Sequence, residues 1–159
     1  MLLRRSFFAA LLLILAGPLA ATELAGQVVA IADGDTLTLL TAERRQVRIR
    51  LAGIDTPESR QPYGTRARQE LAGLAFRQQV RIEVQDVDRY GRTVGTVFVG
   101  RSNINAEMVR RGAAWVYGRY NKDPALPRLE VAARQARAGL WALPPAERVP
   151  PWEWRRPRR

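Results

Sequence analysis

Short segments in which apolar and polar residues alternate are the first regular feature of the chain, and they begin near Leu24. The alternation is clearest between residues 47 and 51, which read Val-Arg-Ile-Arg-Leu. Because residues two apart lie on the same face of a β-strand, this segment predicts a strand with one buried face. Arg50 is expected to point away from the core.

Four further segments predict four more strands, and the first of them is mostly apolar rather than alternating. They cover residues 27–32, 36–40, 80–85 and 93–99. The sequence Asp33-Gly34-Asp35 joins the first two in a predicted hairpin, because Asp-Gly is a common hairpin turn. The polar sequence from Asp88 to Arg92 predicts a second turn and places Arg92 at the start of the last strand.

Apolar residues at helical spacing predict three helices. The first covers residues 65–78, the second begins at Ser102 or Asn103 and ends at Arg111, and the third covers 126–138. Residues 113–117 are expected to be extended. Five short strands, with a helix after the third, are compatible with a small Greek-key barrel such as the OB-fold.

The two ends of the chain depart from this pattern. Residues 1–21 combine Arg4-Arg5 with an apolar run and small residues, which is typical of a secretory signal peptide. An uncleaved membrane anchor is the second interpretation, although the run is short for a span of about 20 residues. Residues 144–159 are rich in proline and arginine and lack periodicity, so we expect a disordered tail. The predicted domain, residues 22–143, is therefore secreted or periplasmic.

Composition limits the available chemistry. The 159 residues contain no Cys and no His, which excludes thiol nucleophiles, histidine bases and zinc sites built on imidazole or thiolate. Lys and Arg number 26 against 15 Asp and Glu, a formal net charge of +11. Arginine suits a polyanion, because a guanidinium binds a phosphate through two hydrogen bonds. Charge that serves solubility explains the composition equally well.

Three polar motifs carry the candidate chemistry: Asp33-Gly34-Asp35-Thr36, Arg50 to Glu58 (Arg-Leu-Ala-Gly-Ile-Asp-Thr-Pro-Glu), and Asp88-Arg89-Tyr90-Gly91-Arg92. Each motif alone is explained more simply as a turn. Together, in this order and approximate spacing, they resemble the signature motifs of the staphylococcal nuclease (thermonuclease) family. The resemblance extends over residues 25–141, and three spaced motifs are far more specific than one.

This resemblance implies an α+β fold that is mainly β, a five-stranded OB-fold Greek-key barrel with three helices. It also implies calcium-dependent hydrolysis of phosphodiester bonds in DNA and RNA. The expected Ca²⁺ ligands are the carboxylates of Asp35 and Asp55 and the backbone carbonyl of Thr56, because Ca²⁺ prefers hard oxygen donors. Water and a phosphate oxygen would complete its coordination shell.

The resemblance also assigns catalytic and binding roles. Glu58 is expected to act as the general base or to orient the attacking water. Arg50 and Arg92 would bind phosphate oxygens and stabilise the charge of the transition state. The expected substrate-binding residues are Arg89 and Tyr90 for phosphate, and Trp115 and Tyr117 as a platform for bases. Ordinary core packing is an equal explanation for Trp115, since the best-known member of the family carries Tyr there.

Two other functions stay open on the sequence alone. One is a non-catalytic nucleic-acid-binding module on the same fold, since a fold does not determine a function. The other is a cationic interaction protein that acts through the arginine-rich tail. For the nuclease we expect a monomer without an obligate protein partner, and contact with a membrane only through an uncleaved leader.

Overall fold

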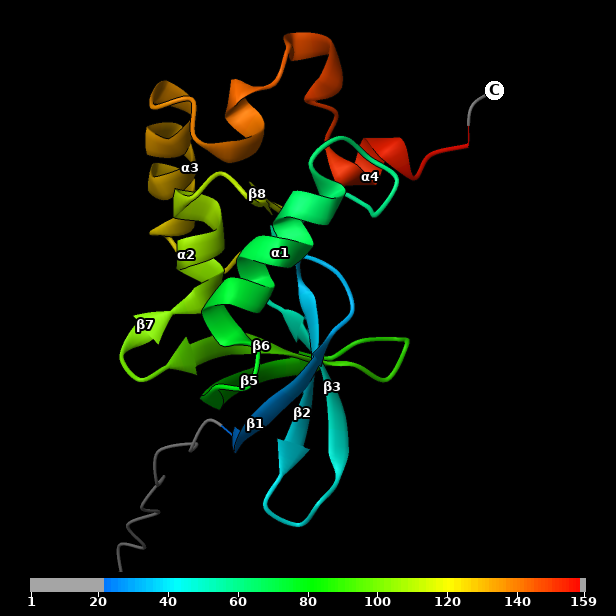
Figure 1. Ribbon diagram of the computed structural model, residues 1–159, viewed down its shortest axis with the longest axis vertical. Helices are drawn as coiled ribbons and strands as arrows, with labels where there is room; N and C mark the ends of the chain where they lie inside the picture. The colour runs from blue at the N-terminus through cyan, green and yellow to red at the C-terminus, as the bar shows by residue number, and fades with distance from the viewer. Residues whose placement is uncertain (1–21, 158–159) are drawn as a thin grey trace, which may run out of the picture.

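The computed structural model describes residues 22–157, so the predicted signal peptide lies outside the described residues. Five of its strands form a barrel (Figure 1): β1 (Glu23–Ile31), β2 (Thr36–Thr41), β3 (Gln46–Leu51), β5 (Gln79–Val87) and β6 (Thr93–Val99). Neighbouring strands pair in the order β3-β2-β1-β5-β6, and a parallel pairing of β3 with β6 closes the sheet on itself. The predicted five-stranded barrel of the OB type is confirmed.

The inward faces of these strands form the core. Leu37, Leu39, Ile49, Leu51 and Ile82 are fully buried there, as the alternation of apolar residues predicts. The antiparallel register places Leu37 opposite Ile49 and Thr36 opposite Arg50. Arg50 is therefore on the polar side of β3, and its side chain is held at the end of the barrel.

Three helices cover one end of the barrel in Figure 1: α1 (Gly64–Ala75), α2 (Ile104–Arg110) and α3 (Leu126–Gln135). They lie close to the predicted positions. Asn103 caps α2, because its side chain accepts a hydrogen bond from the backbone of Ala106. Four short elements complete the region: β7 (Ser102–Asn103), the 3₁₀ helix η1 (Gly139–Ala142), and the paired strands β4 (Ile54–Asp55) and β8 (Trp115–Val116).

The expectation of a disordered tail from residue 144 is wrong for the part that the structure describes. The 3₁₀ helix η2 (Pro145–Glu147) is followed by the helix α4 (Pro151–Trp154). The domain thus has four α-helices among the described residues, one more than the three expected. Trp152 packs edge-on against Trp115, in a second apolar cluster that also contains Leu140 and Trp141. The burial of a large aromatic ring explains the order, because it offsets the conformational entropy lost by the segment.

No helix among residues 22–157 is both long enough and apolar enough to cross a membrane.

Candidate active site

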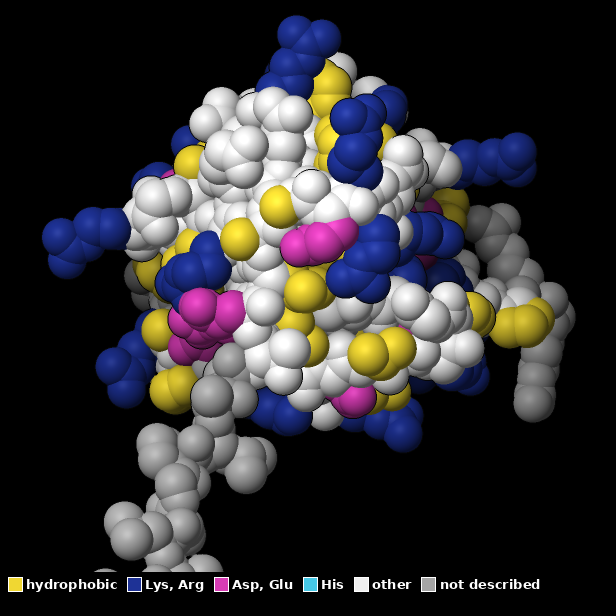
Figure 2. Space-filling view, turned by 90° about the horizontal axis from the view of Figure 1, so that it is seen from below, with side chains coloured by type: hydrophobic (Ala, Val, Ile, Leu, Met, Phe, Trp, Pro, Cys, Tyr) yellow, Lys and Arg dark blue, Asp and Glu magenta, His cyan; other side chains and the backbone are white. Residues whose placement is uncertain are grey.

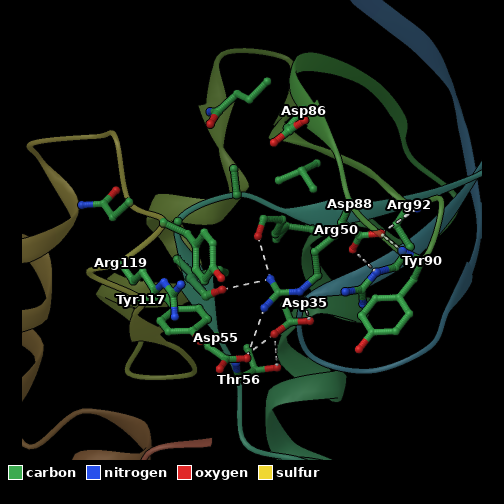
Figure 3. A pocket seen from close by; sticks show the side chains of 18 of the residues that line it. Asp35, Arg50, Asp55, Thr56, Asp86, Asp88, Tyr90, Arg92, Tyr117 and Arg119 are labelled. Atoms are coloured by element: carbon green, nitrogen blue, oxygen red, sulfur yellow. Dashed lines mark hydrogen bonds and ion pairs between the residues drawn. The ribbon is translucent and has the colours of Figure 1, made fainter. Parts of the chain in front are cut away.

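A cleft of about 940 Å³ lies at one end of the barrel, where segments far apart in the sequence meet. Figure 3 shows Arg50 in the middle of it, with Tyr90 and Arg92 on one side and Tyr117 and Arg119 on the other. The predicted site residues that line the cleft are Asp35, Arg50, Asp55, Thr56, Glu58, Arg89, Tyr90, Arg92 and Tyr117. Trp115 does not line it. The structure therefore brings nine of the ten predicted residues together.

Arg50 connects the two buried carboxylates. Its Nε lies 3.2 Å from Oδ1 of Asp35, and its Nη2 lies 3.1 Å from Oδ1 of Asp55. Nη1 donates hydrogen bonds to the carbonyl oxygens of Leu51, at 2.7 Å, and Ile54, at 2.9 Å. With so many of its donors engaged, the guanidinium is held in one position in the cleft.

Asp35 and Thr56 are also joined directly. The backbone N–H and the side-chain hydroxyl of Thr56 donate to Oδ2 of Asp35, at 2.9 and 3.0 Å. Gly34 permits this approach, since a Cβ there would lie 2.7 Å from the hydroxyl oxygen of Thr56. These hydrogen bonds connect the Asp33–Thr36 motif to the Arg50–Glu58 motif.

The donor chemistry of this corner suits a hard cation. Asp35 and Asp55 are almost completely buried, with exposed fractions of 5% and 1%. Burial raises the pKa of Asp55. A hydrogen bond from Arg155 lowers this pKa, and the negative charge of Asp35 raises it further, so that the net shift is upward. Burial and the charge of Asp35 also raise the pKa of Asp33 to about 6. Closely spaced carboxylates that disfavour one another's ionisation gain from a bound cation.

This corner does not form a closed metal cage. Residues 22–157 contain no group of three or more acidic side chains placed to hold one ion. A cation bound by Asp35 and Asp55 would therefore keep coordination positions for water and substrate, which is what a catalytic metal requires.

Glu58 lies in a turn that leads from this corner into α1. The backbone N–H of Glu58 donates to the side chain of Gln61 at 3.1 Å, and its carbonyl oxygen accepts from the backbone of Gln61 at 2.8 Å. Gly64 is necessary here, because a Cβ would lie 1.9 Å from the carbonyl oxygen of Glu58. The backbone of Glu58 is thus fixed, while its side chain is 40% exposed.

The turn between β5 and β6 is organised by Asp88. Its carboxylate accepts from the backbone N–H groups of Tyr90, at 2.9 Å, and Arg92, at 3.0 Å. It also accepts from Nε of Arg92 at 2.7 Å. Burial raises the pKa of Asp88, but the hydrogen bonds from Arg92 and Tyr90 together outweigh burial, and the pKa is lowered. Asp88 therefore aims the Arg92 side chain into the cleft.

The aromatic residues divide into a cleft group and a core group. Trp115 is only 8% exposed, and its ring packs against that of Trp141 at 4.5 Å between centroids. The expectation that it stacks on bases is wrong, because its ring fills the second apolar cluster. Tyr117 does line the cleft, and its ring stacks on that of Trp152 at 5.0 Å and an angle of 3°.

Two residues that the sequence did not indicate are prominent. Asn105 is buried, donates to the carbonyl oxygen of Ala52 at 2.9 Å and accepts from the backbone of Val97 at 3.0 Å. It thereby fixes the loop after β3. Arg155 forms ion pairs with Asp55 at 2.7 Å and Glu58 at 2.6 Å. The two tryptophans of the tail could have indicated that this segment is ordered, because disordered segments contain few aromatic residues.

Comparison with known proteins agrees with this geometry. A family model described as staphylococcal nuclease homologue matches residues 48–143. A micrococcal nuclease of Shigella flexneri is 47% identical over 163 residues, which cover 96% of this chain and 91% of that protein. An uncharacterized endonuclease of Escherichia coli O157:H7 is 42% identical over 152 residues, covering 95% and 97%. A staphylococcal-like nuclease of Arabidopsis thaliana is 42% identical over 115 residues, covering 72% and 35%. The chain belongs to the staphylococcal nuclease family.

Proposed function

We propose that this protein is a calcium-dependent nuclease that hydrolyses phosphodiester bonds of DNA and RNA with little sugar or sequence specificity. Family membership supports the nuclease activity. The observation that carries the proposal is the position of Arg50, between the carboxylates of Asp35 and Asp55. A phosphate-binding group, a pair of hard oxygen ligands and the carboxylate of Glu58 line the same cleft.

Asp35 and Asp55, with the backbone carbonyl of Thr56, are the proposed calcium ligands. When bound, Ca²⁺ supplies Lewis-acid stabilisation of the phosphate and a charge that favours ionisation of water. Arg50 maintains the spacing of the two carboxylates, because its guanidinium contacts both of them. Their burial strengthens the attraction for a cation, since bulk water screens the charges less.

Glu58 is the proposed general base. Its side chain is exposed enough to contact water, while the hydrogen bonds to Gln61 fix its backbone. The chain contains no histidine, so a carboxylate is the ordinary side chain suited to this role near neutral pH. Glu58 would take the proton of the water that attacks the phosphorus.

Arg50 and Arg92 would bind two oxygens of the scissile phosphate. Both side chains are held by carboxylates, Arg50 by Asp35 and Asp55 and Arg92 by Asp88. Such fixed charges stabilise the negative charge that builds on the phosphoryl oxygens during attack. An electrostatic role fits better than proton donation, because the pKa of a guanidinium lies above about 12.

The rest of the cleft suits a polymer. Tyr90 is 66% exposed, and the cationic residues Arg89, Arg119 and Lys122 also line the cleft. Contacts to phosphate and stacking on aromatic rings carry little base information, which supports weak sequence preference. Figure 2 shows Lys and Arg side chains around the outline of the face seen from below, consistent with general attraction to a polyanion.

Export is part of the proposal. It is supported by the basic and apolar pattern of residues 1–21. The mature protein would act outside the cytoplasm as a monomer, on DNA or RNA that it meets there. No obligate protein partner is needed, because the residues proposed for catalysis all come from this chain.

The test is a nuclease assay on single-stranded DNA and on RNA with millimolar calcium, with chelator, and with Glu58→Ala. We expect cleavage only with calcium and a large loss of rate in the variant. Activity that resists chelator would contradict the metal assignment, and full activity of the variant would contradict the base. Binding of DNA without any cleavage would favour the non-catalytic module instead.

A further inference from the structure

The C-terminal arm, residues 149–157, inserts a positive charge among the acidic residues of the site. Arg155 Nη2 lies 2.7 Å from Oδ2 of Asp55, and its Nη1 lies 2.6 Å from Oε1 of Glu58 and 3.3 Å from Oδ1 of Asp55. One guanidinium therefore forms ion pairs with a proposed calcium ligand and with the proposed base at the same time. A cation and Arg155 would compete for the same carboxylate oxygens.

The same arm also covers the aromatic surface of the cleft. Trp152 stacks nearly parallel on Tyr117, with the ring centroids 5.0 Å apart. Arg155 is the C-cap of α4 and keeps a helical backbone, and residues three apart lie on the same face of a helix, so Trp152 and Arg155 face the site together. In this arrangement a flat ring occupies the face of Tyr117 on which a base would stack, and a guanidinium occupies the carboxylates.

The contacts of the arm separate into a firm base and a loose end. Its base is held by Gln61, whose side-chain amide donates to the carbonyl oxygen of Val149. In Figure 1, α4 lies beside the loop that leads into α1, which contains Gln61. The side chains of Arg155 and Glu58 are 44% and 40% exposed, so solvent screens that ion pair, whereas Asp55 is buried. To leave the cleft, the end of the arm must give up the ion pairs of Arg155 and the packing of Trp152 on Tyr117 and Trp115, while Val149 can stay attached to Gln61.

We propose that the C-terminal arm is a built-in inhibitor of the site, with Arg155 held by Asp55 and Glu58 until a divalent cation displaces it. Displacement frees Glu58 to accept a proton and exposes the ring of Tyr117. The proposal rests on the calcium-dependent nuclease proposed above. It adds that calcium also opens the cleft to the polymer, so that cation binding and access of the substrate are coupled.

The coupling has a physical consequence for affinity. An intramolecular guanidinium is present at high effective concentration beside Asp55, so calcium must displace it before binding. Removal of Arg155 therefore makes calcium bind more tightly, and calcium loosens the arm in the unmodified protein. Both effects have the same coupling free energy, because calcium and the Arg155 guanidinium compete for the carboxylate of Asp55.

The test compares Arg155→Ala with Arg156→Ala in the full-length chain. Both substitutions remove one positive charge from neighbouring positions, but Arg156 forms no ion pair within the described residues. Calcium binding is measured by isothermal titration calorimetry, which does not depend on activity. We expect Arg155→Ala to lower the Kd for calcium at least about fivefold, the lower end of common couplings, and Arg156→Ala to leave it unchanged.

A second measurement reports on the arm itself. Hydrogen–deuterium exchange of a peptide covering residues 149–159 should become faster when calcium is added to the unmodified protein. It should already be fast in Arg155→Ala. The same Kd in both variants, or slower exchange with calcium, would overturn the inhibitory arm. Calcium that binds to none of the proteins would contradict the proposed metal site, and the inference with it.

Discussion

The cleft has a buried half and an open half, and they are stabilised in different ways. In the buried half the Arg50 side chain is 14% exposed and that of Asp55 is 2% exposed, and each has several charged or hydrogen-bonding partners. In the open half Tyr90 is 66% exposed, and the turn that carries it depends mainly on the single carboxylate of Asp88.

This difference separates chemistry from recognition. Groups that bind a cation and a reacting phosphate must be held before the substrate arrives, because electrostatic catalysis depends on fixed dipoles and charges. Groups that contact many different nucleotides gain from mobile, exposed side chains. Glu58 belongs to both halves, since its backbone is fixed and its side chain reaches solvent.

The largest effect is expected for Glu58→Gln. Loss of the general base should lower kcat by about 10²- to 10⁴-fold, while the melting temperature changes little because the side chain is exposed. Rates with calcium at saturation and thermal unfolding without substrate are the two measurements. Glu153→Gln is the control, because this exposed carboxylate lies on α4 and forms no side-chain ion pair within residues 22–157. A normal rate for Glu58→Gln would remove Glu58 from the mechanism.

The next effect separates Arg50 from Arg92. Each change to Ala should lower kcat by about 10²- to 10³-fold, because each removes one charge from the transition state. Arg50→Ala should also lower the free energy of unfolding by about 3 kcal/mol, since it leaves buried Asp35 without a cation and Asp55 with Arg155 alone. Added calcium should restore part of that loss.

For Arg92→Ala, urea unfolding should show a change below about 1 kcal/mol, because Arg92 and Asp88 are both partly exposed. Equal destabilisation by the two substitutions would show that the buried and open halves do not differ as described.

A smaller effect is expected from the backbone that holds Glu58. Gly64→Ala should lower both stability and kcat, because the new Cβ would overlap the carbonyl oxygen of Glu58. Gly73→Ala in the same helix is the matched control. A Cβ at Gly73 meets no atom within 4 Å, and Ala is favoured over Gly in helices by about 1 kcal/mol. Denaturant unfolding should therefore show opposite signs, and the same sign for both would contradict the close approach.

The smallest effect concerns Asp88. Asp88→Asn should lower the free energy of unfolding at pH 7 by about 1 kcal/mol, because it weakens the charged hydrogen bonds of the turn. Hydrogen bonds lower the pKa of Asp88 in the folded state. The carboxylate therefore stabilises the fold above its ordinary pKa, and that stabilisation is lost as pH falls through the lower folded value.

The difference between Asp88→Asn and the unmodified protein should accordingly shrink in acid, as measured by unfolding at a series of pH values. Asp86→Asn serves as the control in the same hairpin, because within the described part of the chain its exposed carboxylate accepts only the backbone N–H of Val87.

Much of this molecule could be predicted from local sequence. Alternating residues identified the barrel strands, because each strand buries one face, and the charged motifs identified most residues of the cleft. The buried role of Trp115 could not be assigned, since a tryptophan suits both a core and a base platform. Asn105 gave no signal, because a polar residue at the start of a helix is ordinary until its partners in the loop after β3 are known.

The sequence by itself determined the chemistry: a chain without Cys or His, with carboxylates and arginines at the ends of predicted strands, is limited to hard cations and phosphate. Only the tertiary structure decided which charges meet. Arg155 lies 100 residues from Asp55 along the chain and 2.7 Å from it in space. Contacts between distant segments depend on how the barrel closes and where the apolar cluster draws the tail, and no local pattern records that.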